Sequence, residues 1–201
     1  MRRLRADSES GIAEAAAAIS RGEVVAFPTD TAYGLGADPR SAPAVDRIYA
    51  IKGRPREMPL ILLAASTDDL AGWAVLSPRA LDLASRHWPG PLTLVVPAGA
   101  EVPSAIRAAD GSIGVRVPAH PAAIGLLART GPLATTSANR SGGPSPRSAD
   151  DVAAAFGEAP ERPHVLLDAG ATRHAADSTV LSLVGEPRIL REGALREGDL
   201  R

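Results

Sequence analysis

The stretch SAPAVDRIYAIKGRPREMPLILLAA, residues 41–65, joins a predicted helix to a predicted strand. The helix has a serine cap at its start, apolar residues at helical spacing, and Gly53 as its expected stop. Residues 59–65 form a short apolar run typical of a buried strand. A helix followed directly by a buried strand favours a fold in which helices cover a central sheet.

The same signals recur along the whole chain. They predict about seven strands and five or six helices in mixed order, which indicates an α+β protein of α/β type: one twisted, open, mixed sheet flanked by helices. The predicted helices are 11–22, 41–53, 66–73, 77–88, 120–131 and 148–157, and the predicted strands lie within 23–27, 59–65, 92–98, 112–118, 132–138, 164–170, 178–185 and 187–193.

Length and composition limit the class of protein. The chain has 201 residues, 45% of them hydrophobic, which fits a single domain spanning 1–201. It has no cysteine, which excludes disulfides, thiolate nucleophiles and cysteine-ligated zinc, and no apolar run of membrane-spanning length. A net charge of −1 disfavours binding to nucleic acid by bulk charge. We therefore expect a cytoplasmic protein without a membrane segment.

Polar segments follow or interrupt the predicted strands, where ligands tend to bind in open sheets. They are FPTDTAYGLG (27–36), KGRPREMP (52–59), TSANRSGGPSP (136–146), VRVP (115–118) and ILREG (189–193). None contains a P-loop, a complete Rossmann glycine pattern, a Gly-x-Ser-x-Gly elbow or an HExxH helix. The sequence therefore predicts a binding site without one of these common signatures.

Three features of these segments allow two interpretations each. Lys52, the one lysine among 21 arginines, either complements a helix end or binds a phosphate together with Arg54. Arg116, in the middle of a strand, either faces solvent or needs an anionic partner, and Arg191 raises the same question. The hydroxyl-rich stretch at 136–141 forms either an ordinary turn or an anion-binding loop.

The ordered set of these segments resembles the YrdC/Sua5 family, the L-threonylcarbamoyladenylate synthases. The family signature pairs K-x-R with S-x-N, here Lys52-Gly53-Arg54 and Ser137-Ala138-Asn139. The chain is similar to the short form, a YrdC-like domain without the additional C-terminal Sua5 domain. The resemblance implies a large, positively lined central cavity.

The resemblance also implies a reaction and its site. Threonylcarbamoyl-AMP and pyrophosphate would form from L-threonine, bicarbonate and ATP with Mg²⁺, without a dedicated metal site on the protein. The product would pass to a tRNA threonylcarbamoyl transferase complex for the t6A37 modification. The tRNA itself is a second candidate partner. The implied ATP-binding residues are Lys52, Arg54, Ser112, Asn139, Ser145 and Arg191; the implied threonine-binding residues are Thr31, Tyr33, Arg116, Ser137 and Ser178; Lys52, Arg54, Ser137 and Asn139 would be catalytic.

Two positions depart from the family pattern. Met58 and Leu63 stand where many members carry asparagine and histidine that contact the ligand. Two alternatives to the main interpretation remain: a paralogue with another nucleotide activity, such as the carbamoyl-transfer module of hydrogenase maturation, or an RNA-binding module. The first normally belongs to a larger protein with zinc-finger-like cysteines, and this chain has none. The net charge of −1 disfavours the second.

Overall fold

A computed structural model describes residues 1–157 and 159–200. The strands are β1 (Arg2–Arg5), β2 (Val25–Pro28), β3 (Tyr33–Ala37), β4 (Ile61–Leu63), β5 (Leu92–Pro97), β6 (Ser112–Arg116), β7 (Leu133–Ser137), β8 (Val165–Asp168), β9 (Thr179–Ser182) and β10 (Arg188–Arg191). The α-helices are α1 (Glu9–Ser20), α2 (Ala42–Lys52), α3 (Pro78–His87), α4 (Pro121–Thr130) and α5 (Ala149–Phe156), and Asp68–Leu70 and Glu197–Leu200 form short 3₁₀ turns.

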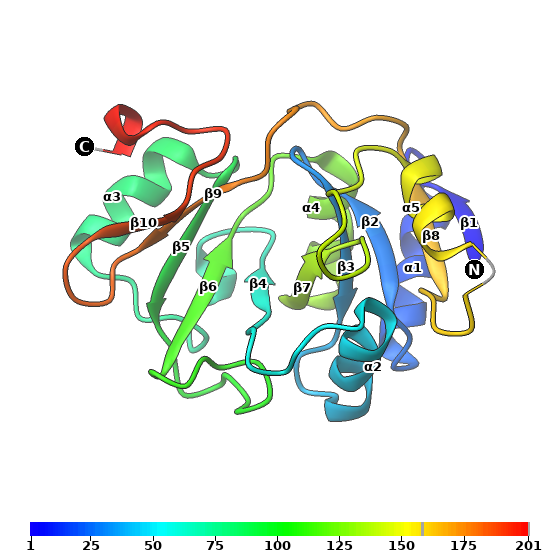
Figure 1. The fold of residues 1–201 in the computed structure, drawn as a ribbon, viewed down its shortest axis with the longest axis horizontal. Helices are drawn as coiled ribbons and strands as arrows, with labels where there is room; N and C mark the ends of the chain where they lie inside the picture. The colour runs from blue at the N-terminus through cyan, green and yellow to red at the C-terminus, as the bar shows by residue number, and fades with distance from the viewer. Residues whose placement is uncertain (158, 201) are drawn as a thin grey trace.

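All these strands belong to one ten-stranded sheet in the order β1-β8-β2-β3-β7-β4-β6-β5-β9-β10. The pairs β1/β8, β2/β8, β4/β6 and β5/β9 are parallel and the other neighbours are antiparallel, so the predicted mixed sheet is confirmed. The edge strands β1 and β10 lie toward opposite ends of the molecule, near the two termini (Figure 1).

The sheet has ten strands rather than about seven, and β3 explains part of the difference. Its sequence, YGLGA, contains two glycines, which are unfavourable in strands, and it was expected to belong to an irregular segment. A Cβ at Gly36 would lie 2.7 Å from the Phe27 ring, and one at Gly34 would lie 3.0 Å from Thr135 Cγ2. The glycines therefore let β3 fit between its neighbours, a requirement that only the assembled sheet reveals.

One predicted helix is wrong. Residues 66–73 form only the 3₁₀ turn Asp68–Leu70, and Gly72 follows with a φ of 80° in the left-handed region. The segment closes a local turn instead, because Ser66 donates from its backbone N–H and its hydroxyl to Asp69 Oδ2. Such side-chain bonds compete with helix formation.

The other five predicted helices are confirmed within two residues at each end. Their starts are marked by local caps: Ser8, Ser41, Ser77, His120 and Ser148 each accept a hydrogen bond from a backbone N–H of the first turn. The helix α2 ends at Gly53, whose φ of 60° fits a left-handed helix end. None of the helices in the described part of the chain is long and apolar enough to cross a membrane.

Helices cover both faces of the sheet, and the strands alternate between two cores. The helices α1 and α4 pack with Val25, Phe27 and Leu63, whereas α2, α3 and α5 pack on the side of Ala26 and Leu62. Successive strand residues point to opposite faces, so β2, β4, β7 and β8 contribute to both cores, whereas β3, β5 and β6 contribute to one.

Candidate functional site

A cavity of about 260 Å³ opens beside the central strands. The wall residues Ile61, Leu63 and Thr135 come from β4 and β7. The remaining lining comes from the β2–β3 turn, the start of β3, the α2–β4 loop, β5, β6, the end of β7, the segment leading into β9, β9 and β10. Seven predicted site residues line it: Thr31, Tyr33, Arg54, Arg116, Ser137, Ser178 and Arg191. Residues that are far apart in the sequence are therefore brought to one cavity.

Arg116 ends β6 with a buried guanidinium, and its side chain has an anionic partner within the chain. Nη2 donates to Asp30 Oδ1 at 2.6 Å, Nη1 to Thr31 Oγ1 at 2.9 Å and Nε to the Gly90 carbonyl at 2.8 Å. Burial lowers the pKa of Arg116, while the Asp30 charge and hydrogen bond oppose that shift. A guanidinium carries five N–H groups, so these three bonds leave two for a ligand in the cavity.

Lys52 is buried at the end of α2, and its ammonium holds the loop after β7. Nζ donates to the Ser137 carbonyl at 2.7 Å and to the carbonyl and Oδ1 of Asn139, each at 2.9 Å. An ammonium offers three donors from one compact centre, which a planar guanidinium does not reproduce. This explains a lysine at this position in an arginine-rich chain. Direct contact between Lys52 and a phosphate stays a prediction.

Burial changes the proton affinity of Lys52. Desolvation, with a smaller contribution from the Arg54 charge, lowers its pKa from the ordinary 10.5 to about 8. Because Lys52 is the only lysine, ¹⁵N-lysine labelling should give one side-chain signal that titrates near pH 8 in the folded protein.

The same shift affects stability. Between about pH 8 and 10.5 the unfolded chain would hold this proton more tightly than the folded chain. The contribution of Lys52 to the free energy of unfolding should therefore rise with pH in this window. A titration midpoint that stays at 10.5 in the folded protein would contradict the buried environment.

The loop after β7 joins the two signature pairs. Ser137 donates to Asn139 Oδ1 at 2.7 Å, and Asn139 Nδ2 donates to the Gly143 carbonyl at 2.5 Å. Arg54 donates to the carbonyls of Met58 and Pro59 at 3.1 and 3.2 Å, which folds the 54–59 segment around its side chain. The K-x-R and S-x-N motifs thus contact each other through Lys52, and Arg54 and Ser137 face the cavity.

Ser112 and Tyr33 do not present their hydroxyls as expected for ligand contacts. Ser112 lies at the opposite end of β6 from Arg116 and donates to Asp110 Oδ1 at 2.6 Å. The Tyr33 hydroxyl donates to the Gly170 carbonyl and accepts from the Ala169 N–H, although part of the side chain lines the cavity. Both hydroxyls form hydrogen bonds within the protein, and their ligand roles stay predictions.

The two departures from the family pattern differ in position. Leu63 lies on β4 and lines the cavity, so the wall is apolar where many members carry histidine. Met58 is 46% exposed, and its backbone carbonyl accepts from Arg54 and from the Tyr49 hydroxyl. Only Leu63 alters the described cavity surface.

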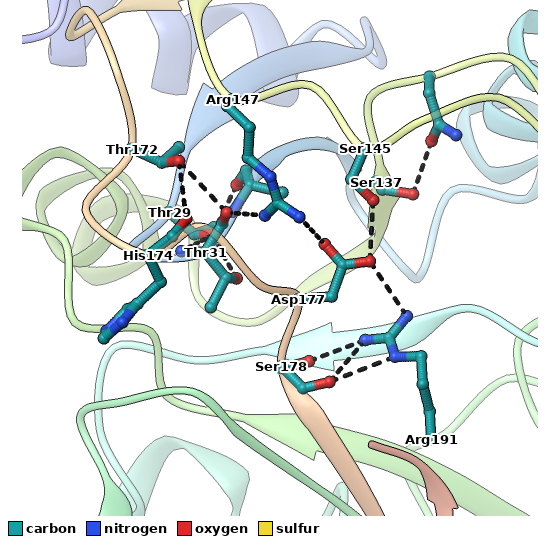
Figure 2. Close-up of polar contacts among 12 residues, drawn as sticks. Thr29, Thr31, Ser137, Ser145, Arg147, Thr172, His174, Asp177, Ser178 and Arg191 are labelled. Atoms are coloured by element: carbon teal, nitrogen blue, oxygen red, sulfur yellow. Dashed lines mark hydrogen bonds and ion pairs between the residues drawn. The ribbon is translucent and has the colours of Figure 1, made fainter. Parts of the chain in front are cut away.

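Sequence reasoning missed three charged residues beside the cavity: Asp30, Arg147 and Asp177. Figure 2 shows Asp177 between two arginines: Oδ1 accepts from Arg147 at 2.8 Å, and Oδ2 lies 3.8 Å from Arg191 and accepts from Ser145 at 2.9 Å. Ser145 thus joins the site through Asp177 although it does not line the cavity. The only signal in the sequence was that Asp30 and Asp177 directly precede two predicted site residues.

Three arginines and several hydroxyls around one cavity are typical of a binding site for a small anionic ligand, here on a mixed sheet covered by helices. Residues 17–193 match the profile of the Sua5/YciO/YrdC family, described as "Telomere recombination". The chain belongs to this family, as the order of its motifs predicted.

Named relatives agree with this assignment. The threonylcarbamoyl-AMP synthase of Pyrococcus abyssi is 44% identical over 188 residues, which cover 92% of this chain and 53% of that protein. The chain therefore spans about half the length of this relative. The threonylcarbamoyl-AMP synthase of Chromohalobacter salexigens is 41% identical, over 86% of this chain and 92% of that protein.

A solved structure also matches. The crystal structure of P. abyssi Sua5 complexed with L-threonine superposes with a TM-score of 0.89 at 43% identity, and covers 96% of this chain and 57% of that chain. The expected YrdC-like fold is thereby confirmed.

Proposed function

We propose that the protein is a transferase of the nucleotidyltransferase type that makes threonylcarbamoyl-AMP. The amine of L-threonine adds to bicarbonate, giving a carbamate and water. A carbamate oxygen then attacks the α-phosphorus of ATP, and pyrophosphate leaves. ATP would enter as its Mg²⁺ complex, with the metal held by phosphate oxygens, as is common in phosphoryl transfer.

The observation that carries this proposal is that three arginines line one cavity. Arg116 keeps two N–H donors for the substrate carboxylate, while Arg54 and Arg191 would supply positive charge for the phosphates. The proposed path needs no protein nucleophile, since the substrate carbamate is the attacking group. Positioning and charge neutralisation would supply the rate enhancement.

The cellular role follows from the product. A mixed anhydride of this kind is a donor for transfer, and we propose that a tRNA threonylcarbamoyl transferase complex in the cytoplasm uses it to make t6A37. RNA binding as the main function is less well supported, because several exposed arginines are already in ion pairs with acids. These include Arg2, Arg3, Arg5 and Arg21.

The test is a turnover assay. Purified protein with ATP, Mg²⁺, bicarbonate and L-threonine should release pyrophosphate and form threonylcarbamoyl-AMP, and leaving out threonine should reduce pyrophosphate release to background. Pyrophosphate release that does not depend on threonine would contradict the proposal. A salt titration of tRNA binding in parallel would reveal an RNA-binding function independent of turnover.

A further inference from the structure

Asp177 is the one carboxylate among the residues that line the cavity, within the described part of the chain. Its side chain is 29% exposed, whereas that of Asp30, the other nearby acid, is 0% exposed and paired with Arg116. A ligand in the cavity can therefore reach Asp177 but not Asp30. A negative charge is unexpected in a site for anionic substrates, so it requires an explanation.

Asp177 is held firmly in place. Its carboxylate is bonded to Arg147 and Ser145, as Figure 2 shows, and its carbonyl accepts from the Ala194 N–H at 2.9 Å. Gly193 packs so closely that a Cβ there would lie 2.3 Å from the Asp177 carbonyl oxygen. The carboxylate is therefore fixed before any ligand binds, a condition that favours specific recognition.

The spacing between Asp177 and Arg116 is fixed through Thr31. Arg116 Nη1 donates to Thr31 Oγ1, the Thr31 carbonyl accepts from Arg147, and Arg147 donates to Asp177. Burial is the main cause that lowers the pKa of Arg116. The charge of Asp177 is among those that raise this pKa, so the two groups lie within electrostatic range. The cavity thus presents a fixed cation and a fixed anion.

Both groups keep unused bonding capacity. A carboxylate accepts about four hydrogen bonds. The hydrogen bonds to Asp177 in the described residues come from Arg147 and Ser145, and Arg191 forms a longer ion pair with it at 3.8 Å. Arg116 keeps two donors beyond its bonds to Asp30, Thr31 and Gly90. An α-amino acid carries a carboxylate and an ammonium on the same carbon, which matches one cation and one anion across a small cavity.

We propose that Asp177 binds the α-ammonium group of the amino-acid substrate, with Arg116 binding its carboxylate. This inference rests on the proposed function and adds a recognition element for the amine. A ligand in which a hydroxyl replaces the amine would keep the contact to Arg116 but lose the charge-assisted bond to Asp177.

The test compares L-threonine with its 2-hydroxy analogue by calorimetry. The wild type should bind L-threonine at least about tenfold more tightly than the analogue, the effect expected for a hydrogen bond to a charged group. In Asp177→Asn the ratio of the two dissociation constants should fall to near one, mainly through weaker threonine binding. Asp177→Glu, which retains the charge, should keep a preference for threonine.

Asp82→Asn is the matched control, because Asp82 lies on α3 in an exposed pair with Arg86 and does not line the cavity. Its ratio should equal that of the wild type. A wild-type ratio in Asp177→Asn, or an equal loss of both ligands, would overturn the inference, because a merely structural role affects both ligands alike. Absence of threonine-dependent pyrophosphate release in the wild type would instead refute the proposed function.

Discussion

Replacing Arg116 with methionine should lower the free energy of unfolding by about 3–5 kcal/mol and abolish threonine-dependent turnover. The large cost arises because Asp30 would be left buried without its charged partner: its side chain is 0% exposed, and Oδ2 has no partner among the described residues. The loss of turnover follows from removing the proposed carboxylate contact. Chemical denaturation and the pyrophosphate assay measure the two effects.

A second variant separates these two contributions. Arg116→Met combined with Asp30→Leu removes both charges, so part of the lost stability should return, since an apolar pair often replaces a buried ion pair without loss. Turnover should not return, because no cation would face the substrate carboxylate. A single variant Arg116→Met as stable as the wild type would show that the Asp30 pair does not stabilise the fold.

Replacing Lys52 with arginine should cost about 2–3 kcal/mol of stability and reduce turnover about a hundredfold, although the charge is retained. The ammonium donates to three oxygens of Ser137 and Asn139, and a planar guanidinium cannot satisfy this arrangement in a buried site. The loop between β7 and α5 would shift, and Ser137 would move relative to the cavity. Denaturation and turnover assays, read together, test this expectation.

Arg56→Lys is the matched control, because Arg56 is exposed and pairs with Asp46 on the surface. Its stability and turnover should stay close to those of the wild type, as expected for exposed ion pairs. The outcome that would contradict the loop-anchoring role is a Lys52→Arg variant with unchanged stability but a large loss of ATP affinity. Lys52 would then act mainly as the phosphate contact that the family resemblance implies.

The elements that were predicted correctly depend on local chemistry. A serine or histidine cap begins each of the five confirmed α-helices, and short apolar runs mark strands such as β5 and β8. These signals act within a few residues, so they can be read without the fold. The strand β3 could not be found in this way, because its glycines are needed where Phe27 and Thr135 on neighbouring strands approach closely.

The site residues likewise divide into those that the sequence identified and those that only the structure revealed. Family motifs identified Arg54, Arg116, Ser137, Ser178 and Arg191, all of which line the cavity. Asp177 was not identified, because an aspartate in a polar loop has many ordinary roles. Its importance appears only when Arg147, Ser145 and Arg191 converge on it from other parts of the chain.

By itself, the sequence determined the five α-helices, most of the strands, the family and seven of the residues that line the cavity, because caps, apolar periodicity and motif order are encoded over short distances. Only the tertiary structure decided what those residues do before a ligand binds. It assigned Lys52 to the Ser137–Asn139 loop and Arg116 to Asp30, and it left Asp177 facing the cavity. The physical reason is that a buried charge takes its partners from whichever strands the fold places beside it.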